Sequence, residues 1–426
     1  MNNLSLKEMT AGKNIVLSLQ HLLAMYAGAV VVPIIIANAW GLSAAHTTYM
    51  VAADIVICGI TTFLQLYRGQ FIGSGLPVVM ASTFTGVGPM VKIGTEFSPA
   101  TAFGSVFVAG IFMLLLAPVF AKLNRLFPPL VSGIVVMLIG ITLMPVAITN
   151  LAGGDGNEAF GDLKFLGVGL LTFLIILLIY RFTEGFVQSI ATLIGLVVGT
   201  VIASFFEMVD LEAVARASWL QIPMPFAISS FHFEMGSILN MIIVGLVTFI
   251  EVTGNYFGLL EKDEKISEAE LKKGYRSASI GYLLAGLFNT TPQTAFSQNL
   301  GVIKMSGVRK REIIVNLVLL MLLIGLIPKL GVVATAIPAP VLGGAMIFLF
   351  GNVFAYGVSV LGAQGLSNED MMIIAAAVAL GLGVTVMPEA FAQLPSWIAW
   401  ITNSGIVAGS TLAVILNLFL NGISEK

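Results

Sequence analysis

Three ionisable side chains lie inside strongly apolar stretches of the sequence, and they are the first candidates for chemistry. Glu251 lies in FIEVTGNYFG, His21 in LSLQHLLAMYAG and Asp54 in VAADIVICG. Burying an ionisable group is expensive, so such a residue usually binds a ligand, relays a proton or pairs with a neighbour. Asn255 follows Glu251 by one helical turn and would share its helix face. The sequence therefore predicts a buried polar site around Glu251.

These side chains suggest different roles. Ionised Glu251 can accept hydrogen bonds from N–H donors of a bound molecule, and protonated Glu251 is neutral, so it could couple a proton to a transport step. His21 is a second candidate for proton coupling, with a satisfied buried imidazole as the alternative. For Asp54 we favour a structural role. No cluster of His, Cys, Asp and Glu has the spacing of a metal site, and no nucleophile–base pair is seen, so we expect no metal, no cofactor and no enzyme activity.

The composition defines what must hold these side chains. Of the 426 residues, 58% belong to the hydrophobic set and 10% are charged, with a net charge of −2. Soluble domains carry about 25% charged residues, so a soluble enzyme, a disordered chain and a nucleic-acid binder are excluded. The single cysteine, Cys58, excludes a disulfide framework. The chain is a polytopic membrane protein.

Apolar segments recur along the chain, and we count 14 candidate transmembrane segments, seven in each half. With a cytoplasmic N-terminus, all of the 20 lysines and arginines would lie inside except Lys92, Lys164, Arg216 and Lys329. This charge bias follows the positive-inside rule. We therefore expect a multi-pass protein of the cell inner (plasma) membrane with both termini in the cytoplasm.

Seven crossings per half place the second half upside down relative to the first, as inverted repeats. The predicted fold is all-α, with the third segment of each half broken by a short extended strand. In segment 3, Gly75-Leu76-Pro77 precedes VVMASTF, and in segment 10, NTTP (289–292) precedes QTAFSQN. We expect half-helices to begin at Ser82/Thr83 and at Ser297/Gln298, with their N–H groups facing one cavity. Two ordinary proline kinks are the alternative.

The run Gln298-Asn299-Leu300-Gly301 continues as VIKMSG and resembles the signature of the nucleobase–ascorbate transporter family, Q/E-N-x-G-x-x-x-x-T-R/K/G. Ser306 stands where threonine is usual. Supporting matches are QH at 20–21, GLPVVMASTF, Glu251-x-x-Gly254 and LFNTTPQTAFSQN. The chain resembles the bacterial xanthine permeases of the family, although many xanthine/urate-type members carry Asp where this chain has Asn255.

The resemblance implies a core domain (residues 1–121 and 237–335), a gate domain (residues 122–236 and 336–426) and a homodimer. It implies that Glu251 and Gln298 hold the base by hydrogen bonds and that Phe84 adds a backbone N–H and an aromatic contact. Asn299 and His21 would organise the site. With residues drawn from the broken segments themselves, the predicted substrate-binding set is Glu251, Gln298, Phe84, Ser297, Thr83, His21, Asn299 and Asn255.

The predicted function is import of a purine nucleobase, xanthine or urate, by cation symport with alternating access. Glu251 and His21 are the proton-coupling candidates, and sodium remains an alternative to the proton. Uracil or another nucleobase is an alternative substrate. An anion transporter of the same architecture is a second class, but it would not be expected to place an ionised Glu251 at its anion site. An ion channel would need repeated pore motifs or charged rings, and the sequence has neither.

Overall fold

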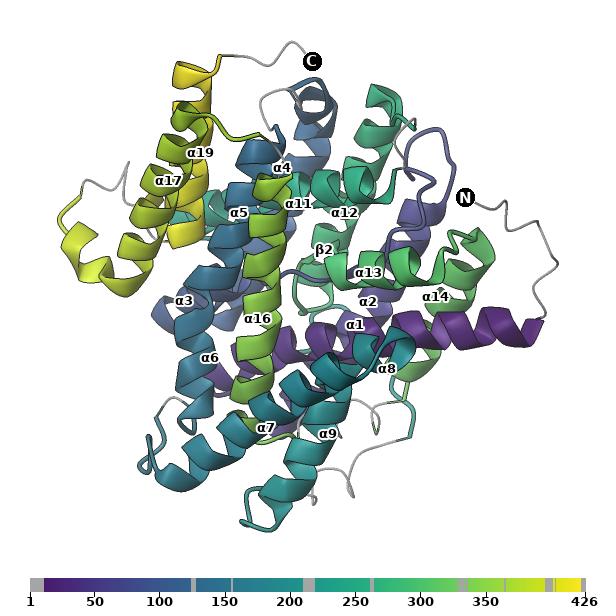
Figure 1. Ribbon diagram of the computed structural model, residues 1–426, viewed down its shortest axis with the longest axis vertical. Coiled ribbons are helices and arrows are strands. Elements are labelled where there is room, and N and C mark those ends of the chain that lie inside the picture. The colour runs from purple at the N-terminus through teal and green to yellow at the C-terminus, as the bar shows by residue number, and fades with distance from the viewer. Residues whose placement is uncertain are drawn as a thin grey trace.

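The computed structural model describes residues 11–123, 128–154, 156–209, 219–260, 264–327, 329, 333, 336–363, 365–394, 401–402 and 404–422 (Figure 1). Helices dominate each half of the chain. The first half contains α1 (Ala11–Ala39), α2 (Ala44–Leu66), β1 (Met80–Ser82), α3 (Val87–Glu96), α4 (Pro99–Leu123), α5 (Pro129–Thr142), α6 (Met144–Leu151), α7 (Leu163–Phe182), α8 (Gly185–Ser189) and α9 (Ala191–Ser204). The second contains α11 (Met235–Leu259), α12 (Glu268–Leu287), β2 (Gln293–Ala295), α13 (Ser297–Ser306), α14 (Arg311–Gly325), α16 (Ala339–Gly362), α17 (Asn368–Val386), the 3-10 turn η2 (Pro388–Phe391) and α19 (Gly405–Leu420).

Eight stretches of helix among the described residues are long and apolar enough to cross a bilayer. They lie in α1, α2, α4, α5 with α6, α7, α11, α16 and α17. Many large apolar side chains on the outside of the fold are exposed, including Leu115 on α4, Leu174 on α7 and Phe419 on α19. In water such a surface would be unfavourable, whereas in lipid it needs no cover. The chain is therefore built as a multi-pass membrane protein.

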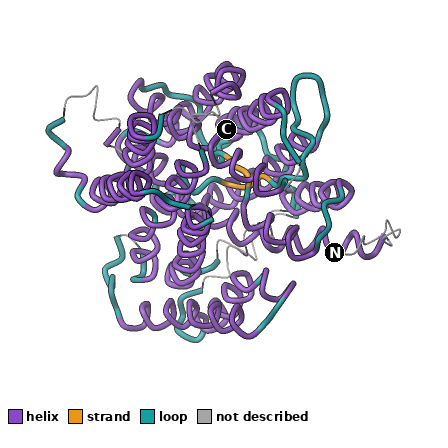
Figure 2. The backbone as a smooth tube through the Cα atoms, turned by 45° about the horizontal axis from the view of Figure 1, so that its top comes forward, coloured by secondary structure: helices purple, strands orange, loops and turns teal. Residues whose placement is uncertain are grey.

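Two short strands cross at the centre of the molecule. β1 and β2 pair antiparallel, with Met80 opposite Ala295 and Ser82 opposite Gln293, and helices surround them on all sides (Figure 2). The pairing continues beyond the strands, because Thr83 N donates to Pro292 O at 2.8 Å and Phe296 N donates to Val79 O at 2.8 Å. These bonds satisfy backbone groups that lipid could not.

Each strand leads into a short helix. α3 and α13 have 10 residues each, about 15 Å, which is half the hydrocarbon thickness of a bilayer. α13 begins at Ser297, as predicted, but α3 begins at Val87, later than the predicted start at Ser82/Thr83. The delay has a local cause: the Thr83 hydroxyl accepts a bond from Thr85 N at 3.2 Å, which holds this stretch in a turn before the helix starts.

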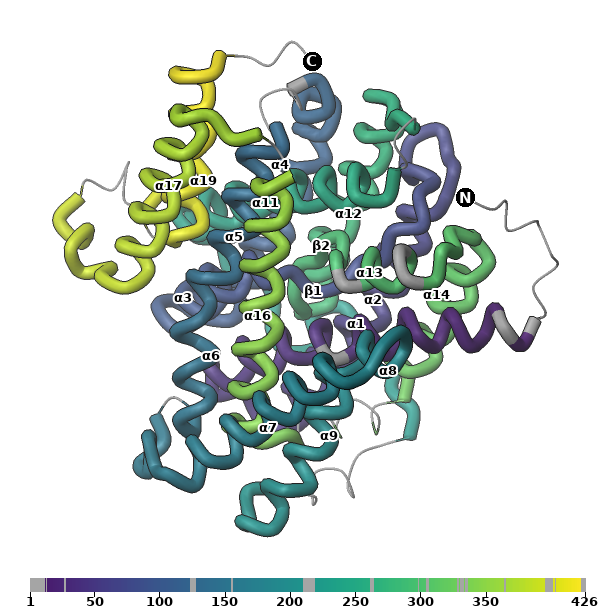
Figure 3. The backbone as a smooth tube through the Cα atoms, in the orientation of Figure 1, coloured from purple at the N-terminus to yellow at the C-terminus, as the bar shows by residue number. Residues whose placement is uncertain are grey.

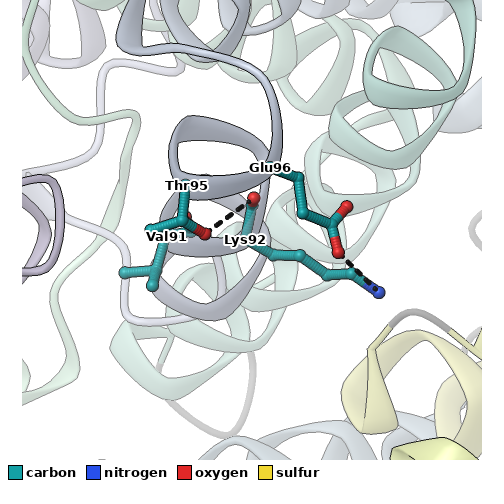
Figure 4. Close-up of polar contacts among 4 residues, drawn as sticks. All are labelled: Val91, Lys92, Thr95 and Glu96. Carbon is teal, nitrogen blue, oxygen red and sulfur yellow. Dashed lines mark hydrogen bonds and ion pairs between the residues drawn. The ribbon is translucent and has the colours of Figure 1, made fainter.

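The far end of α3 leaves the apolar interior. Lys92 and Glu96 form an ion pair at 3.8 Å on its exposed face, and the Thr95 hydroxyl donates to Val91 O at 2.9 Å (Figure 4). Both charged side chains are partly exposed, so this end of the half-helix lies at a surface rather than in lipid. α3 therefore runs outward from the strand crossing.

The charged stretch 264–276 is partly a helix with a buried face. α12 starts at Glu268, and its first turn is held by a capping box between Ser267 and Glu270. Leu271 and Tyr275 on this turn and the next are buried. Hydrogen bonds from the backbone N–H and the hydroxyl of Ser267 lower the pKa of the Glu270 carboxyl.

Glycines allow the closest helix contacts. A Cβ at Gly140 on α5 would lie 2.4 Å from Phe354 N on α16, and a Cβ at Gly357 on α16 would lie 2.5 Å from Met137 N on α5. Close backbone approach through small residues is how membrane helices associate without a hydrophobic driving force. α16 therefore packs on α5, as α12 packs on α4 and α17 on α19 (Figure 1).

Candidate functional site

A pocket lies where the two strands meet α11. Two helices from elsewhere in the fold, α5 and α16, close its other side. We call this the central pocket; Figure 3 labels the two strands that form its floor. It is lined by Ser82, Phe84, Val136, Ile139, Glu251, Gly254, Asn255, Thr294, Ala295, Phe296, Ser297, Val353 and Tyr356.

Glu251 supplies the carboxylate of this pocket. It lies in the second half of α11 and is 9% exposed. The Thr85 hydroxyl donates to Glu251 Oε1 in a very short contact, and the Thr83 hydroxyl donates to Oε2 at 3.4 Å. A carboxylate has about four lone-pair sites, so these two donors leave room for a donor on a bound molecule.

Asn255 lies one turn beyond Glu251 and ties α11 to the second strand. Its amide nitrogen donates to Glu251 O and to Ala295 O, both at 3.0 Å. The second of these carbonyls belongs to the last residue of β2. Asn255 thereby fixes the distance between the carboxylate helix and the strand, while its side chain still lines the pocket.

Phe84 and Ser297 contribute an aromatic wall and a helix N-terminus. Phe84 packs edge-on against Phe350 of α16, with ring centroids 5.1 Å apart. Among the described residues, no hydrogen bond uses the N–H of Phe84. Ser297 is the first residue of α13, whose opening N–H groups have no partner within the helix. The pocket therefore combines an aromatic face, an acceptor and backbone donors.

Asp54 lies behind the pocket and holds both strands. Its carboxylate is fully buried. Oδ2 accepts from Ser82 Oγ at 2.5 Å and from Cys58 Sγ at 3.5 Å, and Oδ1 accepts from Thr291 Oγ1 at 2.5 Å and from Thr290 Oγ1 at 3.2 Å. Ser82 ends β1, and the two threonines precede β2. One carboxylate therefore binds both strand segments. This surrounding matches the structural role predicted for Asp54.

His21 does not line the central pocket. It is buried on α1, and its ring Nδ1 lies 3.1 Å from Asn299 Nδ2, which also donates to His21 O at 3.0 Å. Among the contacts that the structure describes, His21 therefore makes none with Glu251, the other proton-coupling candidate. The amide of Asn299, on the face of α13 that packs against α1, takes the imidazole as its partner instead.

The predicted set thus divides in the structure. Glu251, Phe84, Asn255 and Ser297 line the central pocket, and Thr83 contacts its carboxylate. His21 and Asn299 form a pair beside it. The backbone of Gln298 belongs to α13, but its side chain lies outside the described part of the structure.

Sequence reasoning missed Thr85 and Tyr356. The signal for Thr85 is the spacing of STFT: Thr83 and Thr85 are two residues apart, so in extended chain they project to the same side. Tyr356 has no comparable signal, because it is one aromatic residue among many in an apolar helix. Within the described residues, no group of three or more His, Cys, Asp and Glu could hold a metal ion.

Fold and site together define a multi-pass membrane protein with a polar pocket at the crossing of two broken segments. Comparison with known proteins gives the family. A model described as a permease family matches residues 12–390. The chain belongs to this family, the nucleobase–ascorbate transporters.

Similar proteins support the assignment. The xanthine permease of Bacillus subtilis (strain 168) is 45% identical over 416 residues, 97% of this chain and 95% of that protein. The uric acid permease PucK of the same organism is 45% identical over 95% of this chain and 94% of that protein. Among solved structures, the transmembrane domain of the cyanobacterial bicarbonate transporter BicA has a TM-score of 0.62 at 19% identity, covering 89% of this chain and 98% of that chain. The last likeness concerns the fold alone.

Proposed function

We propose that this protein is a secondary active transporter that imports a purine nucleobase, xanthine or urate. The observation that carries the proposal is a single carboxylate, Glu251, in a pocket that otherwise offers neutral polar groups and aromatic rings. Purine bases present ring N–H donors beside carbonyl acceptors on a flat aromatic body. The names of the two Bacillus relatives, a xanthine and a uric acid permease, support the same substrate class.

In this proposal each polar group of the pocket has a task. Glu251 accepts hydrogen bonds from N–H groups of the base, while Thr83 and Thr85 hold the carboxylate in place. Phe84 contacts the flat face of the base, and its backbone N–H donates to a carbonyl. Gln298 pairs with the opposite edge through its amide, which both donates and accepts.

We propose protons as the coupling ion. Glu251 can carry a proton, and its hydroxyl neighbours can donate to the carboxylate or accept from the acid. His21 is bonded to Asn299 rather than to Glu251, so it would act on coupling through α13. The described pocket has no second carboxylate among its lining residues, which favours a proton over a caged sodium ion.

Alternating access would follow from movement of a core domain (residues 1–121 and 237–335) against a gate domain (residues 122–236 and 336–426). Helix packing supports this division: α4 packs on α12 and α2 on α14, whereas α5 and α7 pack on α16. Fourteen crossings in two inverted repeats and a homodimer complete the proposed architecture. The charge bias supports a plasma-membrane location with cytoplasmic termini.

An anion transporter is the second candidate, because the fold resembles the bicarbonate transporter domain. The pocket chemistry opposes it. An ionised Glu251 facing the N-terminus of α13 would occupy or repel the position where an anion would bind. A uracil permease would differ at Gln298 rather than in the fold.

Uptake of labelled xanthine into cells lacking other purine carriers tests the proposal. Unlabelled xanthine and urate should compete, whereas bicarbonate and sulfate should not. Dissipating the pH gradient at constant sodium should collapse accumulation, and removing sodium at constant pH should not. Competition by anions but by no base would overturn the proposed substrate class, and a sodium requirement at fixed pH would overturn proton coupling.

A further inference from the structure

A second pocket lies beside the central pocket, between α1, α7, α8, α9, α13 and α16. We call it the side chamber. It adjoins the central pocket along two helices: Gly301 is one turn after Ser297 on α13, and Asn352 is next to Val353 on α16. Its other lining residues are Leu23, Ala24, Tyr180, Gln188, Ser189, Ile190, Thr192, Leu193, Phe348 and Leu349.

Asn352 is the unusual residue of the side chamber. It lies near the middle of α16, a helix of 24 residues, and its side chain is exposed. Within the described part of the chain, no hydrogen bond uses its amide, although Asn299 and Asn255 both have partners. A free amide facing lipid at this depth would lose its hydrogen bonds at a cost of several kcal/mol. Asn352 must therefore meet water or a polar ligand.

The surroundings of Asn352 fit a flat polar ring. Tyr180 and Phe348 pack edge-on with ring centroids 5.4 Å apart. Gln188 donates its amide N–H to Tyr180 O at 2.9 Å, which leaves its carbonyl oxygen as an acceptor. An aromatic pair with two amides offers stacking, donors and acceptors, the same chemistry that the central pocket offers.

Cavities on two sides of the side chamber differ in character. A third pocket shares Ser189 with it and continues along α1 and α13 past Gln20 to Ser306 and Val308. By contrast, the cavity between the later parts of α1 and α9 is lined almost wholly by apolar residues such as Val30, Leu196 and Val201. Polar lining thus continues from the central pocket toward one membrane face, the one where α1 begins and α13 ends.

We propose that the side chamber is a second, transient purine-binding site on the route between the central pocket and this membrane face, with Asn352 as its recognition residue. The inference rests on the proposed transport of a purine. The base leaves Glu251, contacts the Asn352 amide and the Tyr180–Phe348 pair, and then passes Ser189 and Ser306. Because the chamber lies outside the central pocket, it controls transit rather than equilibrium affinity.

Two substitutions separate transit from binding. Asn352→Leu removes the amide, and Gly301→Leu places a bulky side chain in the chamber, where a Cβ at this glycine meets no atom within 4 Å. Each should lower xanthine uptake at least about tenfold while purified protein binds xanthine with an affinity within about twofold of wild type. Gly351→Leu is the matched control, because it also has open space around its Cβ but does not line the chamber, and it should transport normally.

The outcomes are distinct from those of the proposed function. If wild type binds no purine, the proposed function fails and this inference with it. If the wild type transports xanthine, and Asn352→Leu and Gly301→Leu both transport it as well as Gly351→Leu does, only the proposed purine site in the side chamber is wrong. Equal loss of binding and uptake in both variants would also overturn it, because that would assign the residues to the central site.

Thiol labelling tests hydration independently of transport. In a Cys58→Ser background, Asn352→Cys should react with a membrane-impermeant thiol reagent from one membrane face, and xanthine should slow the reaction at least about threefold. Val358→Cys, from an exposed position on the same helix, should not react. Absence of labelling at position 352, or labelling that xanthine leaves unchanged, would contradict a purine site in the chamber.

Discussion

The two broken segments meet the same pocket in different ways. After β1, the chain makes a turn that presents Thr83, Phe84 and Thr85 before α3 begins at Val87. After β2, α13 begins almost at once at Ser297 and presents its N-terminus. The first segment therefore organises the Glu251 carboxylate with side-chain hydroxyls, whereas the second offers backbone donors and the position of Gln298. A pocket built from two unlike halves can bind a base that has unlike edges.

The carboxylate is the point on which both halves converge, so its loss should have the largest effect. Glu251→Gln keeps the size of the side chain but removes the charged acceptor and the titratable group. Leaving a substrate donor without its charged partner costs about 1–3 kcal/mol or more, and under the proposed proton symport the coupling would be lost as well. We expect near-total loss of xanthine uptake at normal membrane expression.

Glu234→Gln is the matched control for that substitution. Glu234 lies just before α11 and accepts from Gly236 N at 2.8 Å. Slight burial raises the pKa of this partly exposed carboxyl, but hydrogen bonds from Ser237 and Gly236 lower it on balance, and a glutamine oxygen can replace it as a cap. Uptake should stay near wild type. Wild-type uptake by Glu251→Gln would remove Glu251 from the site.

Asp54 is shared by the two segments, so changing it should damage both together. Asp54→Ala removes the described partner of the Thr291 hydroxyl, while Ser82 and Thr290 keep the carbonyls of Ala29 and Met50 as acceptors. With the Thr291 hydroxyl and the Cys58 thiol both orphaned and two hydroxyls weakened, we expect a loss of roughly 2 kcal/mol in the free energy of unfolding. Thermal unfolding of the purified protein measures this loss.

The same variant should also bind xanthine more weakly, because the strands that position Thr83 and Ser297 are no longer clamped. Asp54→Asn keeps one acceptor oxygen and should be intermediate in both measurements. An Asp54→Ala protein with wild-type thermal stability and wild-type binding would show that the strand pairing alone holds the crossing.

The second segment should control which base is accepted. Gln298→Glu replaces a group that donates and accepts with one that, when ionised, only accepts and that repels the xanthine carbonyl. We expect xanthine uptake to fall at least about tenfold, roughly 1.4 kcal/mol. Gln298→Ala should weaken binding of every base. Unchanged competition profiles in both variants at normal expression would place Gln298 outside the site.

The sequence allowed much of this arrangement to be predicted, because the breaks have local causes. Pro77 and Pro292, with the polar run around them, cannot continue a lipid-facing helix, and Glu251 with Asn255 shows helical spacing. Family resemblance added Phe84, which lines the pocket, while the role implied for Gln298 stays a prediction. These features depend on residues close together in the chain.

What could not be predicted depends on distant contacts. Thr85 reaches a carboxylate 166 positions away, and Asp54 collects hydroxyls from 28 to 237 positions away. Asn299 takes His21 as its partner across 278 positions. In the sequence, Asn352 is one polar residue in an apolar helix, and only the fold places it at the side chamber. Such pairings follow from how helices pack, which residue types and spacing do not encode locally.

The smallest predicted effects separate the two threonines of the first segment. Thr85→Val removes a hydroxyl that donates to the Glu251 carboxylate, and bonds to charged groups contribute about 1.5–3 kcal/mol, so xanthine affinity should fall roughly tenfold; Thr85→Ser should restore it. The Thr83 hydroxyl is 3.4 Å from Glu251 but 3.2 Å from Thr85 N. Thr83→Val should therefore lower the affinity for xanthine only about twofold. The free energy of unfolding should fall by about 1 kcal/mol, because the turn loses its acceptor. Binding and thermal unfolding of the three purified variants check this division. If Thr83→Val weakened binding as strongly as Thr85→Val, the two hydroxyls would act as one unit, and the turn before α3 would have no separate structural role.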